Sequence, residues 1–257
     1  MKARIKQPIL SIVTVCLNEP QLERTCESIS NQTFQNFEWI VIDGGSSART
    51  MAVFYKYKDN ISYLISEKDK GVYYAMNKGI AQSRGLWINF MNAGDGFYRS
   101  DTLENISHEL GYRVEEDVLY GDYIWGYPSY CKEVYMPNEL SISYFLKQGI
   151  CHQAAFIKRN IFSTYGDYDT SLEILSDYKL FLTLFKHKAV FSKLDATVAT
   201  VAERGLSANR EKVEKERDAI IRNLYSDEEL AYLKREPSGR LRSIASNLRC
   251  KFLSHNG

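Results

Sequence analysis

Residues 9–45 read ILSIVTVCLNEPQLERTCESISNQTFQNFEWIVIDGG, and their pattern gives the strongest indication of the fold class. It opens with a β-branched run at residues 9–15 and closes with a second apolar run at residues 37–42. Between them, residues 19–31 place apolar side chains at helical spacing. Two buried strands joined by a helix form a βαβ unit, in which the two strands run parallel.

The same alternation continues along the chain. Helical spacing over residues 48–58 leads to a strand at residues 61–66, and a helix at residues 70–83 leads to a strand at residues 86–91. Strands that alternate with helices in this way predict a Rossmann-like α/β fold, with a mostly parallel twisted sheet that helices cover on both faces.

The second half of the sequence is less regular. Strands are expected at residues 117–120 and 154–157, with a hairpin or loop rich in aromatic residues at 121–137. The helices expected here cover residues 138–150, 174–187 and 208–224.

Composition excludes some classes of protein. The net charge of +1 gives no electrostatic case for a nucleic-acid partner. The five cysteines are odd in number and form no CxxC pair, which is typical of reduced thiols in a cytoplasmic protein. No apolar run approaches the roughly 20 residues of a membrane span, so any membrane contact is expected to be peripheral.

The C-terminal tail differs in character from the rest of the chain. Residues 234–257 carry six basic side chains against one acidic side chain, Glu236, and their apolar residues fall at helical spacing. A basic amphipathic helix can lie on an anionic membrane surface, or it can pack on the domain as a solvated helix. Both interpretations stay open.

Polar side chains follow the four expected parallel strands. Ligands bind at the carboxyl ends of such strands. The candidates at these ends are Asn18, Glu19, Asp43, Asp69, Lys70, Asn92 and Asp95. Carboxylates recur among them, so the sequence predicts an acid-lined crevice suited to a divalent cation and a ribose.

Six segments, in this order, resemble family 2 glycosyltransferases, closest to the branch that builds bacterial exopolysaccharide, colanic-acid-like and O-antigen chains. They are SIVTVCLNE, SISNQTFQNFEWIVIDGGS, SEKDKGVYYAMNKGIAQSRG, NFMNAGD, HQAAFIKR and LSDYKLFL. The resemblance runs from about residue 9 to residue 216. It implies a GT-A fold over residues 1–225, with a donor-binding half at about 1–122 and an acceptor-side half at about 123–225. A helical extension, the basic tail at 226–257, follows.

The resemblance implies an inverting glycosyltransferase. The expected reaction moves a hexosyl or N-acetylhexosaminyl group from a nucleotide sugar, by expectation a UDP-sugar, to a hydroxyl of a saccharide or lipid-linked oligosaccharide. The expected setting is bacterial surface polysaccharide synthesis, in the cytoplasm or at the cytosolic face of the inner membrane.

The donor-side roles also follow from the resemblance. It implies that Asp43 reads the uracil ring, although an Asp before two glycines also suits a turn that leads into the next helix. Asp69 is expected near the nucleotide and Lys70 near phosphate. Residues 92–95, Asn-Ala-Gly-Asp, occupy the place of the family's metal-binding motif. Asp95 is therefore the expected ligand of Mg²⁺ or Mn²⁺, and Asn92 an expected donor contact.

The acceptor-side roles are implied in the same way. Asp177 is expected to be the catalytic base, which takes the proton of the acceptor hydroxyl. The alternative is a helix-opening Asp that the backbone dipoles stabilise. His152 and Gln153 are expected on the acceptor side of the cleft. Arg204, in a loop that resembles the family's late Gly-x-Ser loop, is expected to meet the diphosphate.

The sequence gives little support to two other enzyme classes. A dinucleotide-dependent dehydrogenase lacks support because no GxGxxG follows the first strand. A nucleotidyltransferase lacks support because residues 16–20, CLNEP, form no glycine-rich basic loop. Residues 92–95 contain fewer carboxylates than the family's usual metal motif. The alternative is therefore a non-catalytic protein that binds sugar nucleotides within a polysaccharide assembly complex.

Overall fold

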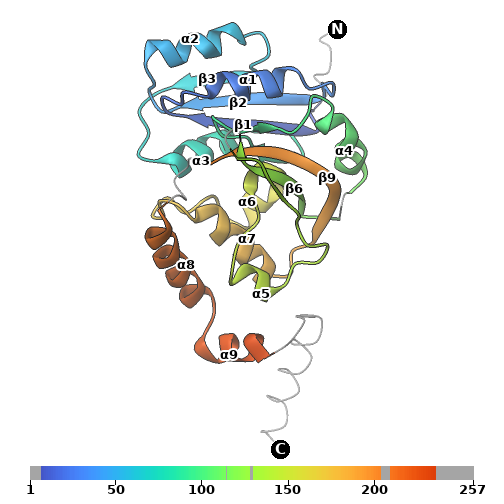
Figure 1. Ribbon diagram of the computed structural model, residues 1–257, viewed down its shortest axis with the longest axis vertical. Helices are drawn as coiled ribbons and strands as arrows, with labels where there is room; N and C mark the ends of the chain where they lie inside the picture. The colour runs from blue at the N-terminus through green and yellow to red at the C-terminus, as the bar shows by residue number, and fades with distance from the viewer. Residues whose placement is uncertain (1–6, 114, 128–129, 204–208, 236–257) are drawn as a thin grey trace, which may run out of the picture.

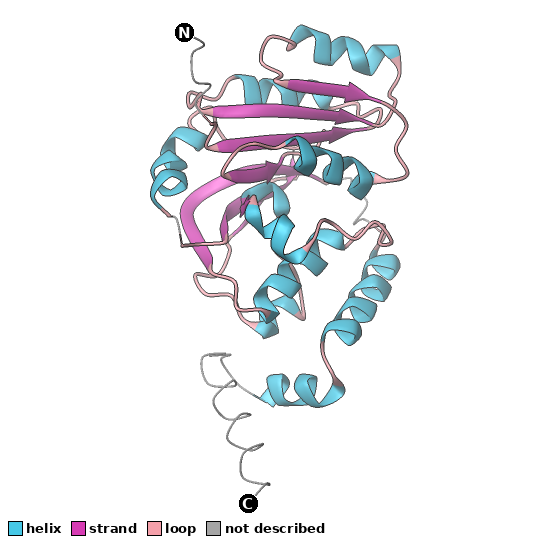
Figure 2. Ribbon diagram, turned by 180° about the vertical axis from the view of Figure 1, so that it is seen from behind, coloured by secondary structure: helices cyan, strands magenta, loops and turns pink. Residues whose placement is uncertain are grey.

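A computed structural model describes residues 7–113, 115–127, 130–203 and 209–235 of the protein. Within these residues one nine-stranded sheet runs in the order β3-β2-β1-β4-β8-β6-β9-β5, with β7 paired to β6. Helices cover both faces of the sheet (Figures 1 and 2).

The first half of the chain forms the parallel part of the sheet. Its elements in chain order are β1 (Leu10–Cys16), α1 (Leu22–Ser30), β2 (Phe37–Asp43), α2 (Ala48–Lys56), β3 (Tyr63–Ser66), α3 (Val72–Gln82) and β4 (Trp87–Phe90). These are the four strands and three helices expected from the sequence. Strands β1 and β2 end one residue later than expected, and the other five elements are shorter by two to four residues.

Strand β1 lies at the centre of the parallel part. Leu10 stands opposite Phe37 of β2 on one side and opposite Trp87 of β4 on the other. The chain therefore leaves β1 toward one edge of the sheet and returns on its other side. Connections diverge at such a position, and the crevice that they leave is the preferred ligand site of open α/β sheets.

The second half of the chain extends the sheet with antiparallel pairings. Its elements in chain order are β5 (Gly96–Phe97), α4 (Thr102–Tyr112), β6 (Val118–Tyr127), β7 (Lys132–Val134), α5 (Ile142–Phe145), the 3₁₀ turn η1 (His152–Ala154), β8 (Ala155–Lys158), α6 (Asn160–Tyr165), α7 (Ser176–Lys186), β9 (Phe191–Ala202), α8 (Arg210–Leu224) and α9 (Asp227–Arg235). Strand β8 runs antiparallel to both β4 and β6, and β9 runs parallel to β6. The α/β fold class expected from the sequence is confirmed, with one parallel half and one mixed half.

The mixed half contains several elements that the sequence analysis does not predict, namely β5, α4, α6 and β9. No local signal marks β9, because its partners β6 and β5 are distant in sequence. Strand β6 runs on to Tyr127 and pairs with β7, so the aromatic segment forms the hairpin that was one of its two expected structures. The helix expected at 138–150 contracts to α5.

Two apolar cores lie on opposite faces of the sheet. One contains Val13 of β1 and Met76 of α3, and the other contains Ile12 of β1 and Leu22 of α1. Helix α3 packs so closely on β1 that a Cβ atom at Gly79 would overlap the side chain of Val13. This close approach fixes the start of α3, where Lys70 and Tyr73 lie, relative to the strand ends.

Helices α8 and α9 lie below the sheet in Figure 1. Most of the basic tail, residues 236–257, lies outside the described residues, and so its membrane role and the predicted boundary at residues 225–226 stay predictions. No helix in the described part of the chain is long and apolar enough to cross a membrane.

Candidate active site

The Asp43 carboxylate uses one oxygen to close a turn, and its other oxygen has no hydrogen-bond partner among the described residues. Its carboxylate is fully buried at the end of β2. Oδ2 accepts hydrogen bonds from the backbone N–H groups of Gly45 (3.1 Å) and Ser46 (2.8 Å) and from the Ser66 hydroxyl (2.6 Å). Oδ1 is buried and has no partner among the described residues. The turn and ligand interpretations of Asp43 are therefore compatible.

The loop after β1 is joined to its two neighbouring loops. Asn18 has a left-handed backbone (φ 51°) and accepts a hydrogen bond from the Ser47 N–H at 2.9 Å, through Oδ1. The Glu19 carboxylate lies beside Gly94, where a Cβ atom would come within 3.2 Å of Glu19 Cδ. The ends of β1, β2 and β4 thus converge, as the sequence predicted for Asn18 and Glu19.

Asp69 resembles Asp43 in leaving one oxygen open. Its Oδ1 forms an ion pair with Lys78 Nζ at 2.6 Å, while Oδ2 is buried without a partner among the described residues. Lys70 is exposed and lines, with Tyr74 and Lys212, a pocket between α3 and α8.

Asn92 supplies a third open acceptor. Its Oδ1 is likewise buried without a partner within the described chain. Buried polar atoms in native proteins are nearly always hydrogen-bonded, so open acceptors at the ends of β2, β3 and β4 need an explanation. A ligand that donates hydrogen bonds from N–H and O–H groups would satisfy them.

Asp95 is held by the protein on both carboxylate oxygens. Oδ2 accepts from Gln153 Nε2 at 2.6 Å and Oδ1 accepts from the Ala202 N–H at 2.8 Å. Burial raises the pKa of the Asp95 carboxyl, and these two hydrogen bonds oppose the rise. The carboxylate therefore joins the end of β4 to η1 and to the end of β9.

The surroundings of Asp95 neither form a complete cation site nor exclude one. Asp95 is 6% exposed, each carboxylate oxygen accepts one hydrogen bond and keeps a free lone pair, and Gly94 contributes no side chain. Among the described residues, no group of three or more His, Cys, Asp and Glu side chains is placed to hold a metal ion. The metal-ligand role of Asp95 stays a prediction, and Gln153, expected on the acceptor side, points to Asp95.

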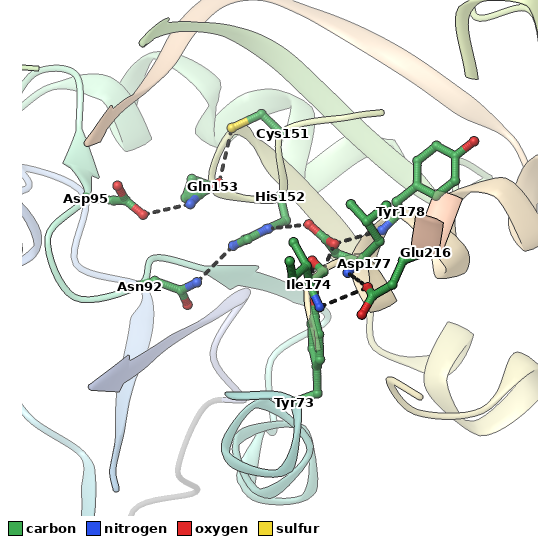
Figure 3. Close-up of polar contacts among 11 residues, drawn as sticks. Tyr73, Asn92, Asp95, Cys151, His152, Gln153, Ile174, Asp177, Tyr178 and Glu216 are labelled. Carbon is green, nitrogen blue, oxygen red and sulfur yellow. Dashed lines mark hydrogen bonds and ion pairs between the residues drawn. The ribbon is translucent and has the colours of Figure 1, made fainter. Parts of the chain in front are cut away.

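Asp177 lies in the first turn of α7 and is hydrogen-bonded to His152 (Figure 3). Asp177 Oδ2 lies 2.7 Å from His152 Nδ1, and the other ring nitrogen, Nε2, lies 3.0 Å from Asn92 Nδ2. The Asp177 and His152 side chains are 17% and 15% exposed. The structure thus brings together an expected base, an expected acceptor-side residue and an expected donor contact.

The second oxygen of Asp177 faces groups on α3 and α7. Oδ1 accepts from the Tyr178 N–H at 2.9 Å, and the Tyr73 hydroxyl, which donates to the Ile174 carbonyl, lies 3.3 Å from it. Burial, and then the charge of Asp177, raise the pKa of Tyr73 well above its usual range, so the phenol stays a donor. Sequence reasoning missed Tyr73, although it lies in the GVYYAMNKG segment that carries the resemblance.

Glu216 of α8 anchors the loop that leads to Asp177. Its carboxylate accepts the backbone N–H groups of Glu173, Ile174 and Leu175, at 2.9, 3.0 and 2.9 Å. No local sequence signal marks this role, because the loop and α8 are distant in sequence. Arg204 lies outside the described residues, and its diphosphate role stays a prediction.

Comparison with known sequences identifies relatives over most of the chain. The family model "Glycosyl transferase family 2" matches residues 11–113. A PGL/p-HBAD biosynthesis glycosyltransferase of Mycobacterium bovis is 30% identical over 215 residues, covering 79% of this chain and 80% of the relative. An uncharacterized glycosyltransferase of Mycobacterium tuberculosis is 31% identical over 182 residues, covering 68% of each protein.

Solved structures share the fold. S. aureus TarS 1-349 in complex with UDP-GlcNAc superposes with a TM-score of 0.67 at 14% identity, covering 84% of this chain and 65% of that chain. The mannosyltransferase PcManGT from Pyrobaculum calidifontis, in complex with GDP-Man and Mn2+, gives a TM-score of 0.62 at 16% identity, covering 81% and 61%. The chain spans less than two thirds of either structure. These neighbours have the GT-A fold, and the likeness shows that fold alone.

Proposed function

This chain belongs to the family 2 glycosyltransferases, and we propose that it is an inverting enzyme with a nucleotide-sugar donor. The donor is a UDP-sugar, and the acceptor is a hydroxyl group of a saccharide or lipid-linked oligosaccharide. The transferred group is a hexosyl or N-acetylhexosaminyl residue. The setting is bacterial surface polysaccharide synthesis at the cytosolic face of the membrane.

The observation that carries the proposal is the position of Asp177. Its carboxylate opens α7, is partly exposed, and reaches Asn92 at the end of β4 through His152. A base for glycosyl transfer must face the acceptor hydroxyl, on the side opposite the departing diphosphate. A carboxylate opposite the ends of the parallel strands suits this task.

The proposed reaction is a single in-line displacement. Asp177 takes the proton of the acceptor hydroxyl while its oxygen forms a bond to the anomeric carbon. The bond from that carbon to the diphosphate oxygen breaks, and its electron pair leaves with the nucleoside diphosphate. Attack from the opposite face inverts the anomeric centre, so an α-linked donor gives a β-glycoside.

Unpartnered acceptor atoms at the strand ends support the proposal of a nucleotide donor. Asp43 Oδ1 and Asp69 Oδ2 are buried acceptors without partners among the described residues. Uracil offers an N3–H donor and ribose offers two hydroxyl donors, and either type can satisfy such acceptors. The UDP-GlcNAc and GDP-Man named for the two structural neighbours support a nucleotide-sugar donor here.

A divalent cation would act on the departing diphosphate, not on the acceptor hydroxyl. PcManGT is named as a complex with Mn2+, which supports divalent cation use in enzymes of this fold. A cation of this kind neutralises charge on a leaving diphosphate. Asp95 would hold such a cation through the lone pairs that its two hydrogen bonds leave free, and Gln153 and the Ala202 N–H would orient it.

The experiment that tests the proposal measures UDP release from a panel of UDP-sugars, with and without Mn²⁺. Wild-type protein is compared with Asp177→Asn, and UDP affinity is measured by calorimetry on both. We expect donor-selective release by wild type and its loss in Asp177→Asn, with UDP affinity retained. Binding of UDP without release from any donor, with or without a saccharide acceptor, would instead support the non-catalytic sugar-nucleotide-binding component.

A further inference from the structure

The short turn η1 joins the two sides of the site. Its first two residues point in different directions, as Figure 3 shows. His152 lies between Asp177 of α7 and Asn92 at the end of β4, while Gln153 reaches Asp95. Both side chains are mostly buried, so neither is a loosely held surface group.

The positions of the hydrogens on His152 follow from its two partners. An ionised carboxylate only accepts hydrogen bonds, so Nδ1 must carry the hydrogen that faces Asp177. In the amide orientation of this structure, Asn92 Nδ2 faces Nε2 and can only donate, so Nε2 is the unprotonated acceptor. The two contacts are consistent with one another only for a neutral imidazole with its hydrogen on Nδ1.

We propose that His152 is a positioning residue, whose neutral ring, with its hydrogen on Nδ1, holds Asp177 toward the acceptor while Asn92 selects that form. This inference rests on the proposed function of Asp177 as the base. Held at Oδ2 by His152 and at Oδ1 by the Tyr178 N–H, the carboxylate has a fixed orientation before the acceptor arrives.

The amide at position 92 matters for a chemical reason. An aspartate there would present an acceptor to Nε2, and only a doubly protonated ring could then satisfy both neighbours. That imidazolium would stabilise the charged form of Asp177 and make it a weaker base. The Asn92 amide therefore suits the ring form that carries its hydrogen on Nδ1, the form that donates to Asp177.

Other titratable groups face this pair. Asp95 and Cys151 lie on the side of His152, and the phenols of Tyr73 and Tyr168 lie on the side of Asp177. Burial raises the pKa of Cys151 to about 12, and it raises those of both tyrosines above their usual range. The thiol and the two phenols therefore stay neutral through the pH range of a rate measurement.

Two substitutions of His152 separate its two contacts. In His152→Asn, the side-chain amide nitrogen takes the place of Nδ1 and can still donate to Asp177. In His152→Gln, the amide group takes the place of Nε2, and Asp177 loses its partner. We expect kcat to fall about 10- to 100-fold in His152→Gln and only a few-fold in His152→Asn, with donor KM and UDP affinity unchanged in both.

Asn92→Asp tests the selection of the neutral ring. We expect kcat at neutral pH to fall, and to recover as the pH is raised and the ring loses its extra proton. His108→Asn, an exposed histidine on α4, is the matched control and should retain the wild-type pH profile. Equal kcat in wild type and His152→Gln would overturn the positioning role, as would a fall in UDP affinity with kcat unchanged.

A measurement without turnover separates this inference from the proposed function. Long-range ¹H–¹⁵N correlation spectra distinguish the three protonation forms of an imidazole, and the signal absent from His152→Asn is that of His152. We expect the Nδ1–H form in wild type and the imidazolium in Asn92→Asp. An Nε2–H ring in wild type overturns the inference even in an active enzyme. An inactive wild type with the Nδ1–H ring overturns the proposed function instead.

Discussion

The strand ends of the parallel half and the start of α7 hold their carboxylates in different ways. Asp43 and Asp69 each keep one buried oxygen without a partner among the described residues. Asp177 has partners on both oxygens. In the proposed enzyme, a ligand that donates hydrogen bonds would complete the first region, whereas the protein itself supplies the partners in the second. This difference is what binding and proton transfer respectively require.

Of the substitutions considered, removing the charge at Asp177 should have the largest effect on kcat. In Asp177→Asn the side chain cannot accept a proton, so we expect kcat to fall by about 10²- to 10⁴-fold with UDP affinity retained. Single-turnover rates and calorimetry measure the two quantities. The control is Asp169→Asn, which removes an ion pair with Lys179 of α7, the helix that carries Asp177. Comparable loss in both variants would point to damage to α7 rather than to a lost base.

Asp43→Asn should affect the other region, and through binding. The amide oxygen can still close the turn, but the amide nitrogen then faces the ligand where an acceptor is needed. We expect UDP affinity to fall about 10- to 100-fold, with a smaller change in kcat at saturating donor. Asp59→Asn, at an exposed carboxylate after α2, should leave calorimetric UDP titrations unchanged. Wild-type affinity in Asp43→Asn would remove Asp43 from the donor site.

Asp95→Asn tests whether the Asp95 carboxylate serves the structure of the protein or the binding of the donor. Both of its partners, Gln153 Nε2 and the Ala202 N–H, are donors, so an amide group leaves one of them facing another donor. We expect the free energy of unfolding to fall by about 1–3 kcal/mol in urea titrations. If Asp95 is also the metal ligand, the Mn²⁺ dependence of UDP binding falls in the same variant. Unchanged stability with a large loss of Mn²⁺ affinity would support the metal-ligand role alone.

Glu216→Gln should give the smallest effect, because it acts on Asp177 from a distance. One of the three backbone donors of residues 173–175 would then face an amide nitrogen. We expect a loss of stability of about 1 kcal/mol and a few-fold lower kcat. Glu214→Gln, at an exposed position on the same helix, is the control for thermal unfolding and rate. A variant that matches this control would mean that the loop before α7 needs no anchor.

The parallel half could be predicted from local pattern. Each of its strands is a short apolar run followed by a helix, and such units pack in a restricted way. The positions of Asp43 and Asp69 at the crevice therefore followed from the order of elements along the chain. The mixed half gave weaker signals, since β9 takes its place only through pairing with β6 and β5.

The sequence alone was enough to predict the fold class and the family. It also marked Asp177, His152 and Asn92 as separate candidates. Only the tertiary structure placed these three in one hydrogen-bonded chain and turned Gln153 toward Asp95. Hydrogen bonds depend on ångström-scale distances between side chains on β4, η1 and α7. Local sequence pattern sets which elements form, whereas those distances arise only when the elements pack together.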